Sequence, residues 1–459
     1  MTTQHDSTED QQTAESIYSR DTIDAVPHDQ RDFNFWALLF IFMGMQVPVS
    51  YFITGGSVTA GLTLGQAFLT TVVAAVIGFL IMALVGLIGW KTGASTMVCT
   101  RPAFGIIGSV LPALIAFIEL TGWDSVHVQL AGQLMGTIGG PWGLGYTNLY
   151  SIIVGLAIVS LVIWGHKLLT WMERFLVPIV IVLVLMALYA VLRGQDLTAL
   201  WSQSGEGPLT LVLAFDAMFI AVLTWVPMVS DYTRYGKTRS GAFNAALFGS
   251  LPVALFMLFV GQSAAVGLGN PNALEEMVKL GSGFGVMAFL VAMFATVATA
   301  ALIMYSASMS LLNVVPQIPL RLINLFTGTI VIVASITIDL LGNVIGWLTF
   351  QGVLLIPLFA VILVDYFVVR RRDYDIHSLY EHGGIYWGYH GFNLMGYAAW
   401  ILGAVTYIFV HNVFTSLGGG ALSFVVAALL YWLLATFGLR RAEMRHVADE
   451  NDGTRKGTV

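Results

Sequence analysis

Apolar segments of membrane-spanning length recur along the whole chain and are separated by short polar gaps. Each is expected to be a helix, because about 20 apolar residues cross a hydrocarbon core of roughly 30 Å and backbone groups in lipid must bond within their own segment. The expected spans cover residues 33–56, 66–90, 106–136, 149–165, 169–192, 208–230, 243–268, 284–312, 322–340, 347–369, 394–413 and 418–438. The pattern predicts an all-α integral membrane protein with twelve transmembrane helices.

Basic residues lie in every second gap between these segments. After the N-terminal region, the basic gaps contain Lys91 and Arg101, then Lys167, then Arg234, Lys237 and Arg239, then Arg321, then Arg370, Arg371 and Arg372. Basic loops remain on the cytoplasmic side of a membrane. The alternation therefore predicts a multi-pass protein of the cell membrane with both termini in the cytoplasm.

Composition agrees with this class and excludes several others. The chain is 57% hydrophobic and only 10% charged, against roughly 25% charged in soluble domains. The longest polar gap inside the predicted bundle, 370–393, leaves no room for a soluble catalytic domain, and the sequence has neither a phosphate-binding P-loop nor an HExxH motif. The single cysteine, Cys99, excludes an internal disulfide and a multi-thiolate metal site. We expect no catalytic residues and no metal centre.

Two spans contain a proline near their middle. The first contains Gly44-Met45-Gln46-Val47-Pro48 and the sixth contains Thr224-Trp225-Val226-Pro227. These spans run in opposite directions, as an inverted repeat with broken helices at corresponding positions requires; ordinary proline kinks are the alternative. The expected organisation is an acidic, disordered cytoplasmic tail at 1–32, a first repeat at 33–193, a second repeat at 208–372, two further spans at 394–438 and a cytoplasmic tail at 439–459.

The third span carries the densest group of polar residues. At about 100° per residue, Glu119, Trp123 and His127 share one helix face, whereas Asp124 lies off that face. Ionisable residues inside a membrane are costly and are functional candidates. A ring and a polar side chain one turn apart suit a flat heterocycle, with Trp123 stacking on its face and His127 bonding its edge. The structural alternative is that Trp123 packs between helices and that Glu119 or Asp124 satisfies His127.

Several short motifs occur in the order found in one transporter family. They are Thr54-Gly55-Gly56, Arg101-Pro102-Ala103-Phe104-Gly105, Gly122-Trp123, Asp231-Tyr232-Thr233-Arg234-Tyr235, Gly346-Trp347-Leu348-Thr349-Phe350, Asp365-Tyr366-Phe367-Val368-Val369-Arg370, Tyr386-Trp387 and Gly391-Phe392-Asn393. From residue 32 onward the chain resembles the purine and cytosine permeases, the nucleobase-cation symporters that include hydantoin and cytosine carriers. The resemblance implies a five-plus-five inverted repeat, alternating access, and a substrate held between spans one, three, six and eight.

The resemblance also implies particular substrate contacts. The stacking tryptophan falls on Trp123 and its polar partner on His127. The contact from span one falls on Pro48, with Gln46 beside it. The aromatic residue of the broken sixth span falls on Val222, so Trp225, next to Thr224, or Phe219 would have to replace it.

In sodium-coupled members, the resemblance places carbonyl ligands at Gly44, Val47 and Ala295 and two hydroxyls in span eight. Here the two hydroxyl positions are Ala298 and Thr299, so one oxygen ligand is missing. Hard cations require oxygen ligands. A proton is therefore the favoured coupling ion, with Glu119, Asp124 and His127 as candidate carriers, and sodium remains the alternative.

These observations predict a secondary transporter that imports a nucleobase or related planar heterocycle by cation symport, with cytosine or a purine favoured. A carrier of hydroxymethylpyrimidine, hydantoin, allantoin or uracil is the alternative within the family. An amino-acid carrier should have a glycine-rich break that 46–48 does not match, a channel should have rings of charge or a filter loop, and a membrane-embedded enzyme should have a paired metal or nucleophile motif. The expected partners are a small-molecule substrate and the lipid bilayer, with no nucleic acid, no obligate protein partner and no cofactor beyond the co-transported ion.

Overall fold

The computed structural model describes residues 22–437 except 164–165, 280, 340–343 and 415. Within this part of the chain every regular element is a helix, and extended pairing is limited to four isolated bridges. The described residues form two compact units. The first comprises the residues up to Cys99 together with Val110–Gln351, and the second comprises Thr100–Ser109 and the residues from Gly352.

The first unit contains most of the helices and all residues of the candidate site described below. Its elements are η1 (His28–Gln30), α2 (Phe35–Met45), α3 (Ser50–Ser57), α4 (Leu64–Thr92), α6 (Val110–Gly139), η3 (Gly140–Trp142), α7 (Thr147–Ile163), α8 (His166–Leu192), α9 (Leu197–Ser202), α10 (Leu211–Leu223), η4 (Val226–Met228), α11 (Val229–Thr233), α12 (Arg239–Leu268), α13 (Ala273–Lys279), α14 (Ser282–Val314) and α15 (Leu320–Thr337).

The second unit contains shorter connecting elements and the last helices. Its elements are α5 (Arg101–Phe104), the π-helical turn η6 (Asp365–Val369), η7 (His377–Leu379), α17 (Leu394–Val413) and a helix at Gly420–Phe437. The short η2 (Val98–Thr100) and the long α16 (Val344–Val364) cross the boundary between the two units.

Nine helices of the described chain are long and apolar enough to cross a membrane, and the bent pair α2–α3 makes ten if it counts as one span. α7 is a shorter apolar helix of 17 residues. The all-helical, membrane-spanning class predicted from the sequence is therefore confirmed.

The first predicted break is present. α2 ends at Met45 and α3 begins at Ser50, and the two half-helices are bent by 63°. Pro48 lies inside the gap, where its missing N–H and fixed φ interrupt helical hydrogen bonding. In the sixth span the helix axis is not sharply bent, and Leu211–Thr233 counts as one span. The α-helix nevertheless ends at Leu223, and a turn at Thr224 and Trp225 leads into the 3₁₀ segment η4.

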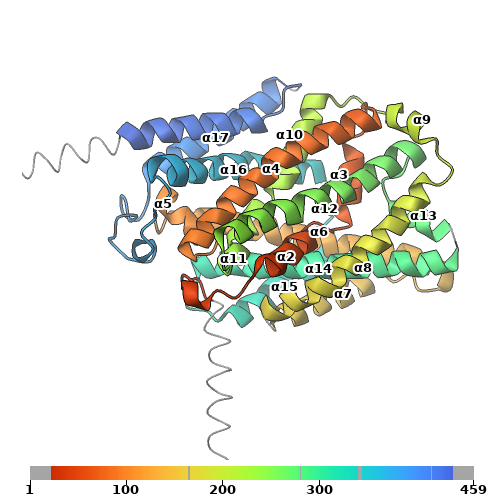
Figure 1. Ribbon diagram of the computed structural model, residues 1–459, viewed down its shortest axis with the longest axis horizontal. Coiled ribbons are helices and arrows are strands. Elements are labelled where there is room, and N and C mark those ends of the chain that lie inside the picture. The colour runs from red at the N-terminus through yellow and green to blue at the C-terminus, as the bar shows by residue number, and fades with distance from the viewer. Residues whose placement is uncertain (1–21, 164–165, 280, 340–343, 415, 438–459) are drawn as a thin grey trace, which may run out of the picture. The chain divides into compact units, whose positions relative to one another are not determined.

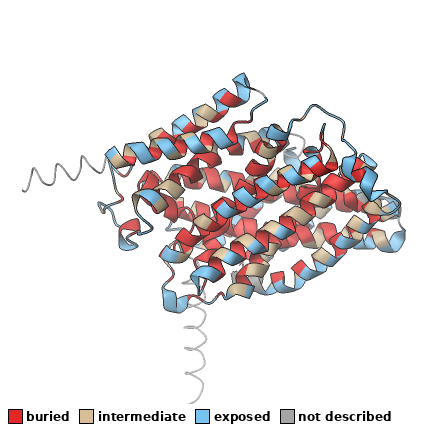
Figure 2. Cartoon of the chain, turned by 45° about the horizontal axis from the view of Figure 1, so that its top comes forward, coloured by how far each residue is buried: buried red, intermediate tan, exposed pale blue. Residues whose placement is uncertain are grey.

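Capping residues set both ends of the long helix α4. Thr63 and Gln66 form a capping box that satisfies free N–H groups at the N-terminus. At the other end, Gly93 adopts φ 72°, a left-handed conformation that glycine tolerates. The outer face of α4 exposes an apolar stripe at helical spacing, made of Leu69, Val73, Val76, Ile77 and Leu80. Figure 2 shows this division between buried inner faces and exposed outer faces, as expected for helices that contact lipid.

The centre of the first unit is formed by α6 packed along α14, while α4 and α12 lie side by side and α2 and α3 pack against α12 (Figure 1). α14 is rich in small buried residues, including Ala295, Ala298, Ala300 and Ala301. Such residues allow helix backbones to approach closely in a membrane. This close packing fixes the position of α6, which carries the polar face identified in the sequence.

The N-terminal tail is shorter than the sequence predicted. The guanidinium of Arg31 is buried and donates to the carbonyls of Val26 and Trp90. The backbone of Phe33 exchanges hydrogen bonds with Tyr235 and Lys237. Residues 22–32 therefore pack on the helices and are ordered, because buried hydrogen bonds replace their solvation. The rest of the predicted tail, and the tail at 439–459, lie outside the described residues.

Candidate substrate site

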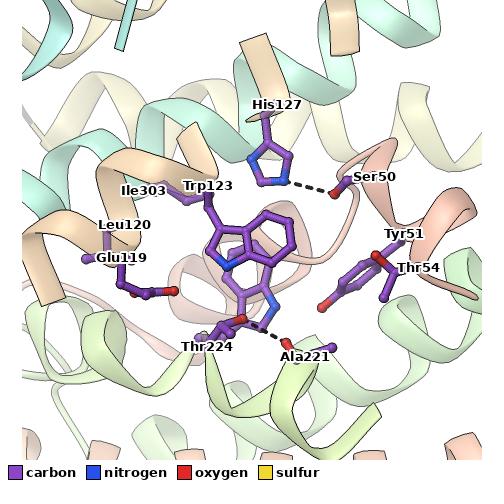
Figure 3. A pocket seen from close by; sticks show the side chains of 11 residues that line it. Ser50, Tyr51, Thr54, Glu119, Leu120, Trp123, His127, Ala221, Thr224 and Ile303 are labelled. Carbon is purple, nitrogen blue, oxygen red and sulfur yellow. Dashed lines mark hydrogen bonds between the residues drawn. The ribbon is translucent and has the colours of Figure 1, made fainter. Parts of the chain in front are cut away.

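A cavity lies at the break between α2 and α3. Four elements of the first unit contribute to it: α3, α6, α14 and the region from α10 to η4. Its lining consists of Ser50, Tyr51, Thr54, Glu119, Leu120, Trp123, His127, Ala221, Thr224, Trp225 and Ile303. Figure 3 shows these side chains converging on one space.

α6 supplies the polar face of the cavity. Glu119, Trp123 and His127 follow one another at intervals of four residues, and all three line the cavity, as the helical spacing predicted. All three are buried. Asp124 is also fully buried but does not belong to the lining, which agrees with its predicted position off this face.

The partner of His127 differs from the one expected. Nε2 of His127 lies 2.9 Å from the Oγ of Ser50 on α3, a contact drawn in Figure 3. The structural alternative from the sequence had assigned this role to a carboxylate of Glu119 or Asp124, but a serine from the half-helix after the break fills it. The imidazole also stacks beside Trp123, with ring centroids 5.8 Å apart and planes 26° apart.

Tyr51 lines the cavity and contacts both the break between α2 and α3 and the sixth span. Its hydroxyl donates to Oε1 of Gln46 at 2.6 Å, and its ring meets that of Trp225 edge-on at 6.2 Å between centroids. Gln46 and Pro48 are buried but do not line the cavity. Contact of Gln46 and Pro48 with the substrate stays a prediction, and Tyr51, which bonds Gln46, is the residue of this region that lines the cavity.

The aromatic wall from the sixth span is Trp225. Trp225 and Thr224 line the cavity, and the hydroxyl of Thr224 donates to the carbonyl of Ala221 at 2.8 Å. Phe219, the other predicted candidate, is buried outside the lining, where it stacks on Phe215 and lies near Gly78 on α4. α10 packs against α4 through this face, so Phe219 is directed away from the cavity.

Several polar groups in the lining have no hydrogen-bond partner among the described residues. They include both carboxyl oxygens of Glu119, Nε1 of Trp123 and Nδ1 of His127. Buried polar groups are normally paired. These groups offer an N–H donor, a carboxyl group and a ring nitrogen within one cavity, which is the set that a heterocycle with donors and acceptors on its edge requires.

Two of the four predicted cation ligands meet directly. The hydroxyl of Thr299 on α14 donates to the carbonyl of Gly44 in the last turn of α2 at 2.9 Å. Val47, in the break, and Ala295, on α14, are both fully buried. The part of the chain that the structure describes contains no group of three or more His, Cys, Asp or Glu side chains suited to a metal ion.

Sequence reasoning did not identify the residues that α3 contributes. Ser50, Tyr51 and Thr54 all line the cavity. The available signal was their spacing, because polar residues at positions i, i+1 and i+4 after Pro48 share one face of a helix. It also missed Leu120, Ala221 and Ile303, whose apolar side chains carry no signal of their own.

Comparison with protein families gives one match to nearly the whole described chain. Residues 25–434 match a family described as permeases for cytosine/purines, uracil, thiamine and allantoin. The chain is 25% identical to a hydantoin permease of Microbacterium maritypicum, over 90% of this chain and 88% of that protein. It is 26% identical to a cytosine permease of Escherichia coli strain K12, over 75% and 79% of the two chains, and 27% identical to an allantoin permease of Bacillus subtilis strain 168, over 83% and 85%.

Solved structures agree on the fold. A transporter of the nucleobase-cation-symport-1 family, in a closed conformation with bromovinylhydantoin bound, superposes with a TM-score of 0.80 at 19% identity, covering 91% of this chain and 94% of that one. A sodium-coupled sialic acid symporter in a substrate-bound outward-open state superposes with a TM-score of 0.62 at 12% identity, covering 92% and 94%.

Proposed function

The chain belongs to the family of permeases for cytosine/purines, uracil, thiamine and allantoin, and from that premise we propose that it imports a planar nitrogen heterocycle by cation symport with alternating access. Cytosine or a purine is the favoured substrate, and hydantoin, allantoin, uracil or hydroxymethylpyrimidine are the alternatives. The observation that carries the proposal is the cavity at the α2–α3 break, which combines an indole face with unpartnered polar groups.

In the proposed complex the heterocycle stacks on Trp123, and Trp225 closes the cavity from the sixth span. Base stacking on an aromatic side chain contributes about 1–3 kcal/mol and accepts any flat ring. Selectivity then depends on the ring edge, which faces Glu119 and His127. A ring edge with adjacent donor and acceptor atoms pairs with a carboxyl group and an imidazole, whereas a hydrocarbon ring would leave both unpaired at a cost of about 1–3 kcal/mol for each group.

The proposed membrane topology has twelve spans. The nine long apolar helices, the bent pair α2–α3, α6 and α7 make up this number. α2–α3 and the interrupted segment from α10 to α11 occupy corresponding positions in a five-plus-five inverted repeat, as in transporters whose substrate site lies between broken helices. Both termini are placed in the cytoplasm, because the basic gaps lie on that side.

The coupling ion in this proposal is a proton. Sodium would require a cage of oxygen ligands, and Ala298 offers no side-chain oxygen while the Thr299 hydroxyl is already bonded to the Gly44 carbonyl. No chemical conversion of the substrate is required, which agrees with permeases as the relatives of this chain.

Uptake of labelled substrates tests the proposal. Cells that lack their own carriers would express the protein and receive labelled cytosine, adenine, uracil, hydantoin, allantoin or hydroxymethylpyrimidine. We expect saturable uptake of at least one of these, inhibited by an excess of the same unlabelled compound. Uptake that is identical in cells with and without the protein, for every compound in the panel, would refute the proposed function.

A further inference from the structure

Glu173 lies on the inner face of α8, although a carboxylate inside a span is costly. It is fully buried, and residues at helical spacing from it, Val177, Val180 and Val184, are buried as well. The neighbouring Arg174 is exposed. The sequence motifs did not single out Glu173, and the cavity described above does not include it.

The carboxyl group of Glu173 packs against the Cα of Gly44 on α2. A Cβ placed on Gly44 would collide with Oε2 of Glu173 and would lie 2.6 Å from its Cδ. Gly44 is the second-last residue of α2, and its carbonyl accepts the hydrogen bond from Thr299. Glu173 therefore touches the point at which the broken span ends and at which α14 holds it.

The surroundings of Glu173 disfavour a negative charge on its carboxyl group. The C-terminal end of a helix carries partial negative charge from its free carbonyls, and the end of α2 is next to this carboxyl group. Neither oxygen of Glu173 has a hydrogen-bond partner among the described residues. An ionised carboxylate in this position would be desolvated, unpaired and adjacent to a negative helix end.

Among the side chains that the structure describes, the helices packed against α8 supply no cation within hydrogen-bonding distance of this carboxyl group. α2 carries no titratable side chain, and α12 carries an exposed arginine at its first residue, Arg239. α14 carries Tyr305, α7 carries Tyr150, and on α13 Lys279 pairs with Glu276. From α11, Tyr232 interacts electrostatically with Glu173, while its hydroxyl donates to the Leu302 carbonyl.

We propose that Glu173 binds the proton that is co-transported with the substrate. The inference rests on the proposed transport function and names the site of its coupling ion. A proton neutralises the carboxylate in place and needs no cage of ligands, whereas sodium would need a full set of oxygen ligands, and the Gly44 carbonyl beside this carboxyl group already accepts a hydrogen bond from Thr299. Because Gly44 ends the half-helix that precedes the substrate cavity, the charge on Glu173 acts on the same break that supplies Ser50 and Tyr51 to the substrate.

Purified protein in liposomes allows net transport and exchange to be measured separately. The substrate is the labelled heterocycle that the uptake panel identifies. With the outside one pH unit more acidic, coupling to one proton supports up to about tenfold accumulation of a neutral substrate. Glu173→Gln keeps the size of the side chain but cannot release a proton, so we expect it to exchange internal for external substrate while its accumulation ratio falls to one. Glu206→Gln, the same substitution at an exposed residue, should accumulate substrate as the wild type does.

A second variant keeps the proposal testable if Glu173→Gln loses exchange as well. Glu173→Asp retains a titratable carboxyl group and should still accumulate substrate when the outside is acidic. A Glu173→Asp protein that exchanges substrate without accumulating it, or a Glu173→Gln protein that accumulates substrate like the wild type, overturns the proposal. Accumulation by the wild type that follows a sodium gradient at equal pH overturns it too.

Protonation of Glu173 is also measured without transport. Glu119 and Asp124 are buried carboxyl groups as well, so their infrared C=O absorption should persist in every variant. The component of this absorption that belongs to Glu173 should be present in the wild type and in Glu206→Gln and be lost in Glu173→Gln. If no band depends on Glu173, the proposal is wrong. Failure of the proposed function has a different signature, because the wild type would then exchange none of the heterocycles whether or not this band is present.

Discussion

The imidazole of His127 and the hydroxyl of Ser50 lie 2.9 Å apart between Nε2 and Oγ, and this contact joins α6 to the half-helix that follows the break. The contact occupies Nε2 of His127, whereas Nδ1 has no partner among the described residues. The residue with the strongest polar signal in the third span is thus oriented by a residue from the first.

The first prediction concerns this contact. His127→Phe should change the ranking of competing heterocycles, because it removes the ring nitrogens from the cavity while keeping an aromatic ring. Ser50→Ala should weaken substrate affinity, since the imidazole loses the contact that orients it in the cavity. Competition uptake measures both effects. Ser57→Ala, on the exposed side of α3, is the matched control, and an unchanged competition profile in His127→Phe would return His127 to a structural role.

The second prediction concerns the stacking wall. Trp123→Ala should weaken substrate affinity about 5- to 150-fold, as the lost stacking implies, while the amount of protein in the membrane stays the same. Loss of the indole removes about 1–3 kcal/mol of stacking free energy. Trp123→Phe should retain part of the affinity. The control is Trp36→Ala, because Trp36 is 62% exposed. Wild-type affinity in Trp123→Ala would show that the substrate binds elsewhere.

The third prediction concerns the close approach of Gly44 and Glu173. Gly44→Ala should lower the thermal stability of the purified protein, because its Cβ overlaps the carboxyl group, and overpacking costs about 1–3 kcal/mol. Glu173→Ala opens space at the same point. The double variant should therefore be less destabilised than the sum of the single effects, as a double-mutant cycle measures. Strictly additive effects would mean that the two residues do not touch in the membrane.

The fourth prediction concerns the driving ion. Uptake should persist when choline replaces sodium and should collapse when a protonophore is added in sodium-free medium. The reason is that Ala298 removes a side-chain oxygen from the position implied by the sodium-coupled relatives, and sodium needs oxygen ligands. Initial rates of labelled uptake in the two media provide the measurement. A steep dependence on external sodium that is insensitive to pH would show that Thr299 and backbone carbonyls suffice as ligands.

The fifth prediction concerns Cys99, in the segment between α4 and α6. Burial raises the pKa of the Cys99 thiol to about 12, well above the usual value of about 8.5. The reactive thiolate is therefore scarce at pH 7 to 8. We expect no labelling by a maleimide in the native protein at pH 8 and stoichiometric labelling after denaturation, as mass spectrometry would show. Rapid labelling of the native protein would mean that this segment opens.

Much of the candidate site follows from periodicity within single helices. The interval of four residues placed Glu119, Trp123 and His127 on one face and Asp124 off it, and the structure agrees. The proline in the first span predicted the break, because proline cannot complete a helical ladder. Both inferences use only the geometry of one segment.

Periodicity fails where the neighbouring helix decides the outcome. Phe219 and Trp225 are both aromatic residues of the sixth span, yet Trp225 lines the cavity while Phe219 lies outside the lining, near Gly78 of α4. Gln46 lies beside the break in sequence, yet it is Tyr51, its hydrogen-bond partner, that lines the cavity. These positions depend on which helix faces which residue.

The sequence by itself determined the membrane class, the helices, the family and the polar face of α6, because hydropathy, proline and helical spacing act locally along the chain. The tertiary structure alone decided that Ser50 is the partner of His127, that Trp225 closes the cavity and that Glu173 lies against Gly44. The physical reason is that helix packing in a membrane depends on the fit of small residues and close backbone contacts between segments far apart in the chain. The helical repeat specifies which residues share a face of one helix, and the packing of helices specifies which residues of other helices contact that face.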